Sequence, residues 1–137
     1  MGAEQSVVKD EESDYRSSLD AVRRGDKKAR TKLAWFLLSG RGGAEIDFEQ
    51  AVSLLEAAVK SQDSEAMWML GLCKECGVGT PQDLEKAVLL FDKSRDAGND
   101  TGRYLSCSWT YERRNGIMKL ESLLQNMIIN HNCSFFF

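Results

Sequence analysis

The chain has 137 residues, 42% of them hydrophobic, and a formal net charge of −3 from 18 Lys and Arg against 21 Asp and Glu. A chain of this length can bury one core without metal or disulfide staples. Because the basic residues are dispersed among acidic ones, we expect no broad basic face. We therefore expect that the partner is not a nucleic acid. No apolar run approaches the roughly 20 residues of a membrane-spanning helix, and the N-terminus lacks a secretory pattern, so we expect a cytoplasmic protein.

The first residues, MGAEQS, match the N-myristoylation pattern M-G-x-x-x-[ST], with Gly2 as the acylated residue and Ser6 at the required position. A chance match explains the pattern equally well. Residues 1–12 are polar apart from Val7 and Val8, and we expect them to form a flexible N-terminal segment. One acyl chain gives only weak, reversible membrane binding. Acylation would therefore make the protein a peripheral membrane protein that binds a cytosolic membrane face reversibly.

Residues 13–25 place Tyr15, Leu19 and Val22 at helical spacing before Gly25. This pattern predicts a helix that behaves as the second helix of an incomplete unit. We expect it to cap the N-terminal end of a stack of helical hairpins, because such a stack must cover its first apolar face.

Residues 26–62 and 63–98 each have the pattern of two helices joined by a glycine turn. In the second copy, Asp63 and Asp83 are expected to cap the two helices, Gly77 to end the first and Gly98 to end the second. The copies superimpose at a shift of 37 before the turn, as in Leu33 over Leu70, and of 36 after it. A repeat of this period with no strand-like alternation predicts an all-α fold, a short α-solenoid of stacked helix-turn-helix repeats.

The second copy carries the pattern A-x-x-x-L-G followed by G-x-G-x-x-x-D-x-x-K-A, formed by Ala66, Leu70, Gly71, Gly77, Gly79, Asp83, Lys86 and Ala87. This pattern resembles the Sel1-like repeat, a relative of the tetratricopeptide hairpin. The first copy departs from it at Ala34 and Gln50, and Leu37 and Lys74 stand where the family usually has tyrosine. The resemblance implies a non-enzymatic adaptor that holds other proteins on a stacked-helix surface.

The pattern begins a third time after Gly98 and then decays, so residues 99–130 are expected to form a degenerate third repeat that caps the stack. The tail, 131–137, ends in three phenylalanines, Phe135–Phe137. Either these side chains dock into the last groove, or the chain is a truncated or alternative product of something longer. A repeat-protein fragment without its own client is accordingly an alternative to the adaptor.

Cys73 and Cys76 form a C-x-x-C motif, which is compatible with zinc or thiol redox chemistry. The alternative is a buried cysteine that acts as a small hydrophobic residue, because Cys73 falls on the apolar helix face. His131 is the single histidine, which leaves no His-paired catalysis away from the C-terminus. We therefore expect no enzyme, no metal site and no cofactor, with a thiol-dependent protein as the remaining alternative.

Trp35 and Trp68 lie two positions from Leu33 and Leu70, off the central apolar line of their helices. They can fill the core between repeats, or they can line the groove formed by the first helices, where Trp is a common anchor of binding surfaces. Together with Lys74, they are the candidate residues for binding a protein or peptide partner.

Overall fold

A computed structural model describes residues 2–115, which form six α-helices and no strand. The helices are α1 (Gly2–Arg23), α2 (Ala29–Ser39), α3 (Phe48–Lys60), α4 (Ser64–Cys76), α5 (Leu84–Asp96) and α6 (Asp100–Asn115), with a one-turn 3-10 helix, η1 (Arg41–Gly43), after α2. This confirms the predicted all-α fold. Among the same residues, no helix has both the length and the apolar character needed to cross a membrane.

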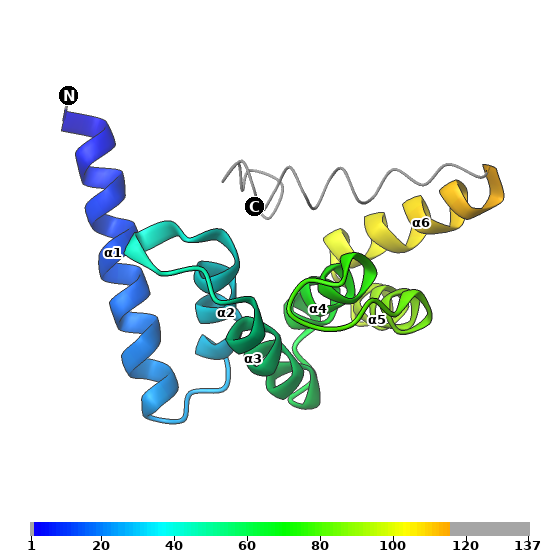
Figure 1. Ribbon diagram of the computed structural model, residues 1–137, viewed down its shortest axis with the longest axis horizontal. Helices are drawn as coiled ribbons and strands as arrows, with labels where there is room; N and C mark the ends of the chain where they lie inside the picture. The colour runs from blue at the N-terminus through cyan, green and yellow to red at the C-terminus, as the bar shows by residue number, and fades with distance from the viewer. Residues whose placement is uncertain (1, 116–137) are drawn as a thin grey trace.

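The helices lie side by side in chain order, from α1 at one end to α6 at the other (Figure 1). α2 packs on α3 and α4 packs on α5, so the two predicted hairpins are present, and α3 packs on α4 to join them. α1 covers α2 at one end of the stack, and α6 covers α4 and α5 at the other. Leu33, Ala34, Ala66 and Leu70 are all buried between these helices, as a stacked solenoid requires.

Side-chain caps and left-handed residues set the helix ends. The carboxylates of Asp47, Asp63 and Asp83 each accept a hydrogen bond from a backbone N–H in the first turn of the following helix. Gly40 and Gly77 adopt φ of 70° and 68° at the ends of α2 and α4. Because glycine reaches this conformation without steric cost, the chain can turn sharply within each hairpin.

The N-terminal helix is longer than expected. The helix predicted for residues 13–25 extends back to Gly2, so the segment 1–12, expected to be flexible, is helical from Gly2 onward. Its inner part has neighbours that the sequence pattern did not reveal: Arg41 forms an ion pair with Glu11, and Gly42 lies against the backbone of Glu11. α1 ends at Arg23, close to Gly25, whose φ is 89°.

A side-chain cap begins α6, because Asn99 accepts a hydrogen bond from the N–H of Gly102 at 3.0 Å in its first turn. α6 is joined to α5 by the hydroxyl of Ser106, which donates to Asp92 at 2.5 Å and accepts from Arg95 at 2.9 Å. The rest of the expected third repeat, 116–130, and the tail 131–137 lie outside the described residues.

Candidate functional site

A groove with a volume of about 500 Å³ lies between α1, α2 and α4. Its apolar lining consists of aromatic and methionine side chains from the first helices of the two hairpins. These residues are Trp35 and Phe36 from α2 and Trp68 and Met69 from α4. Charged residues from the same helices and from α1 line the rest: Glu11, Asp14, Lys28, Lys32, Asp63 and Glu65.

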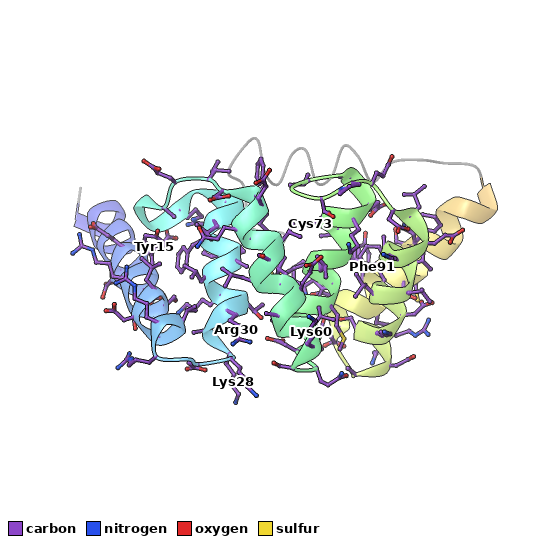
Figure 2. All side chains as sticks on the ribbon, turned by 60° about the horizontal axis from the view of Figure 1, so that its bottom comes forward. Tyr15, Lys28, Arg30, Lys60, Cys73 and Phe91 are labelled. Atoms are coloured by element: carbon purple, nitrogen blue, oxygen red, sulfur yellow. The ribbon has the colours of Figure 1, made fainter. Side chains whose placement is uncertain are left out.

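The aromatic lining is held by ring contacts that reach α1. Phe36 meets Trp35 edge-on at 4.8 Å between ring centroids and meets Tyr15 of α1 in the same way at 5.6 Å. The guanidinium of Arg41 lies 5.7 Å from the centre of the Trp35 ring, within cation–π range. Tyr15 and the side chains around it fill the space between α1 and α2 (Figure 2). The aromatic part of the lining is therefore packed against α1.

Trp68 is only 1% exposed, although its position lies off the apolar stripe that the sequence pattern identified. The reason is that α4 contacts α3, α5 and α6. Every residue from Ala66 to Cys73 is buried as a result. A single-stripe interpretation fails for a helix with neighbours on several sides. Trp35 and Trp68 thus belong to the core and also line the groove, and their role in binding stays a prediction.

Hydrogen bonds and ion pairs fix the groove walls. The hydroxyl of Thr31 on α2 donates to Asp63 at 2.6 Å, and Asp63 also caps α4, so one carboxylate joins the two repeats. Lys32 lies 3.2 Å from Asp14 of α1, with both side chains more than half exposed. The lining thus carries four carboxylates and two ammonium groups.

Lys74 does not share this groove with the two tryptophans. Its side chain is 13% exposed, and its ammonium lies 3.9 Å from a carboxylate oxygen of Glu56 on α3. It lines a separate hollow between α3, α4 and α5. The three candidate residues from the sequence therefore fall on two surfaces.

Cys73 is buried, and burial raises the pKa of its thiol to about 12, with the neighbouring Cys76 adding to the rise and Lys74 opposing it. The thiol is protonated near neutral pH, which makes it a poor nucleophile and a poor metal ligand. In the part of the chain that the structure describes, no three His, Cys, Asp or Glu side chains are arranged to hold a metal ion.

The sequence analysis missed the contribution of α1 to the groove. Glu11 fell in the segment expected to be flexible, and Asp14 was not considered. A helical signal was available in Glu12 and Arg16, four residues apart, whose charged groups lie 2.6 Å apart in the structure. Gly2 is the first residue of α1, and its acylation stays a prediction.

Comparison with known families matches a Sel1 repeat model to residues 27–63 and again to residues 64–99, which together make up more than half of the chain. The chain belongs to the Sel1 repeat family. The matched repeats begin one residue after the units expected from the sequence. Among solved structures, a Sel1 repeat protein from Oxalobacter formigenes is 28% identical with a TM-score of 0.62, and the match covers 69% of this chain and 70% of that one. No curated protein matches the chain.

Placed on the structure, the Sel1 repeats are the α2–α3 and α4–α5 hairpins, and the groove runs along their first helices. Sel1 repeats typically bind proteins. The helices α1 and α6 lie outside the matched residues and flank the two repeats.

Proposed function

We propose that this Sel1 repeat protein is a non-enzymatic adaptor that holds a segment of another protein in the groove between α1, α2 and α4. The observation that carries the proposal is a groove lined both by the apolar side chains of Trp35, Trp68 and Met69 and by charged side chains. Binding surfaces commonly combine buried aromatic anchors with a polar rim that sets orientation. A groove of about 500 Å³ is large enough to accept several side chains of a partner.

The groove is also preorganised, because contacts within the chain already hold its walls together before a partner binds. Its walls are joined by the Thr31–Asp63 hydrogen bond between repeats and by the Lys32–Asp14 and Arg41–Glu11 ion pairs to α1. Little side-chain ordering is then required when a partner binds, and more of the contact energy is available as affinity. The thiol-dependent alternative has weaker support, because burial keeps Cys73 protonated.

Inverting the charge pattern of the rim tests this proposal without touching the buried tryptophans. We expect the double variant Lys32→Glu, Glu65→Lys, which keeps the net charge, to lose the proteins that the wild type captures from cells, as measured by quantitative mass spectrometry. Both residues are exposed, so folding should be retained. The matched control is Lys27→Glu, Glu85→Lys, which makes the same exchange at exposed positions that line neither this groove nor the hollow between α3, α4 and α5. Equal capture by both variants would contradict the proposal.

Acylation of Gly2 remains part of the proposal as a membrane tether for a cytoplasmic adaptor. α1 has 22 residues, and at about 1.5 Å per residue it separates Gly2 from the α1–α2 junction by roughly 33 Å. With an acylated end, that junction would lie at most roughly this distance from the membrane. Mass measurement of the N-terminal peptide from wild type and Gly2→Ala tests the tether separately from the groove.

A further inference from the structure

A second hollow, of about 350 Å³, lies on the outer side of the stack between α3, α4 and α5; we call it the outer groove. Its apolar lining is Val59, Leu70, Leu89 and Leu90. Leu89 is 58% exposed, which makes it one of the few large apolar side chains that the described part of the chain leaves open to solvent. Its exposure places an apolar contact point on the surface of α5.

The outer groove faces away from the groove of the proposed function. Glu65 lines the first groove and Lys74 the second, and both belong to α4. Nine helical residues at about 100° each correspond to two and a half turns, so these two positions lie on opposite sides of the helix. Binding at one surface therefore leaves the other free.

The sequence of α5 builds the outer groove with helical regularity. Lys86, Leu89, Leu90 and Lys93 are spaced i, i+3, i+4 and i+7, which puts them on one face. Val59 and Lys60 lie next to each other near the end of α3, where Lys60 is labelled in Figure 2. On α5, two leucines are thus flanked by two lysines. Across the hollow, α3 contributes one apolar and one basic side chain, Val59 and Lys60.

The charge of this surface is strongly one-sided. Four lysines line it (Lys60, Lys74, Lys86 and Lys93), and Glu56 is the one carboxylate among the described residues that do so. Lys74 is 3.9 Å from Glu56, and Lys86 is 3.9 Å from Asp83. No described carboxylate forms an ion pair with Lys60 or Lys93, so their charges are available to a partner.

We propose that the outer groove docks an acidic amphipathic segment of another protein, whose apolar side chains cover Leu89 and whose carboxylates meet Lys60, Lys86 and Lys93. The charge complementarity selects this occupant, because an uncharged apolar segment would leave the lysines unpaired and a basic one would be repelled. The positions of these groups on α3 and α5 suit an amphipathic helix or extended segment lying along the hollow. This second docking surface does not depend on binding in the first groove.

A displayed library of random peptides, each about 16 residues long, tests the proposal without a known partner. The wild-type chain is the bait, and enriched peptides are measured against three variants. The first is Lys60→Glu, Lys86→Glu, Lys93→Glu. The second is Leu89→Ser, which removes the exposed apolar contact. The matched control is Arg23→Glu, Arg24→Glu, Lys27→Glu, which changes the net charge equally at residues that line neither groove. All seven substituted side chains are exposed, and circular dichroism confirms folding of each variant.

We expect a family of acidic peptides with apolar residues at helical or alternating spacing. Their affinity should fall by about tenfold or more in the outer-groove triple variant, fall in Leu89→Ser, and weaken as salt concentration rises. Binding to the control variant should be unchanged. The proposal is overturned if no acidic amphipathic family is enriched. It is equally overturned if such peptides bind the triple variant as well as the wild type, or lose binding to the control instead.

Discussion

At the scale of single residues, the two repeats solve the same packing problem with different pairs. A Cβ added to Gly71 would lie 2.6 Å from Cε1 of Phe91, closer than atoms can approach. In the first repeat, the corresponding positions are Ala34 and Leu55, and both are fully buried. The larger residue on the first helix is thus matched by a smaller one on the second. The glycine of the second repeat makes room for a phenylalanine ring.

This complementarity predicts coupling between Gly71→Ala and Phe91→Leu. The first change overpacks the contact, at a cost of about 1–3 kcal/mol that is partly offset by the better helix propensity of alanine. The second leaves a cavity and also destabilises the fold. The double variant recreates the Ala34–Leu55 pair, so urea unfolding should show it more stable than the sum of the single changes by about 1 kcal/mol or more. Additive effects would show that the two positions do not determine each other.

The raised pKa of Cys73 predicts a specific loss of stability at alkaline pH. Above its usual value of 9.0 the unfolded chain releases the thiol proton, whereas the folded chain keeps it until about 12. The unfolded state is then favoured, so the free energy of unfolding falls as pH rises through this window. Relative to Cys73→Ala, the wild type should lose about 1.4 kcal/mol between pH 8 and pH 10 in urea unfolding under reducing conditions. A constant difference between the two proteins would argue against a buried, protonated thiol.

At the scale of elements, the sequence predicted the features that depend on local chemistry, namely the helix caps and the helical hairpins. Asp63 and Asp83 cap helices as expected, and the hairpins follow from the repeat. The pattern could not show how many neighbours a helix has, and Trp68 was placed off the buried stripe for that reason. Trp35 and Trp68 were named as candidates and do line the groove, whereas Glu11 was missed because its role depends on α1 packing beside the η1 turn.

The turn glycines show how one repeat rests on the one before it. A Cβ on Gly79 would lie 2.6 Å from the carbonyl carbon of Phe48 on α3, and one on Gly42 would lie 2.7 Å from the carbonyl oxygen of Glu11 on α1. Gly42 and Gly79 are equivalent positions at the shift of 37. The turn of the first repeat therefore contacts α1 in the same way as the turn of the second repeat contacts α3. This contact requires glycine both for its positive φ and for the close approach of two backbones.

A comparison of Gly79→Ala with Gly98→Ala separates these two requirements. Both residues have positive φ, at 66° and 85°, but a Cβ on Gly98 would meet no atom within 4 Å. We expect Gly98→Ala to cost about 1–2 kcal/mol for the left-handed conformation alone, and Gly79→Ala to cost clearly more because the α3 backbone must move. Thermal or urea unfolding of the two variants measures the difference. Equal costs would mean that the repeats do not touch at this turn.

At the scale of the whole molecule, the described residues form a continuous stack in which α1 and α6 cover the ends of two Sel1 repeats. The core runs from Leu33 in α2 to Leu105 in α6. Two surfaces with different chemistry lie on opposite sides of it: an aromatic groove with mixed charge and an outer groove rimmed with lysines. Such an arrangement suits a protein that holds partners in fixed relative positions, provided that the stack itself is rigid.

Thermal unfolding followed in parallel by circular dichroism and tryptophan fluorescence tests this rigidity most directly. Circular dichroism reports all helices, whereas fluorescence reports the first and second repeats through the buried Trp35 and Trp68, and α6 through the partly buried Trp109. Because the repeats share one core and α1 and α6 cover its ends, we predict one cooperative transition with the same midpoint by both probes. A broad melt, or separate transitions for fluorescence and helix content, would contradict a preformed scaffold and favour a fragment that has no stable binding surface of its own.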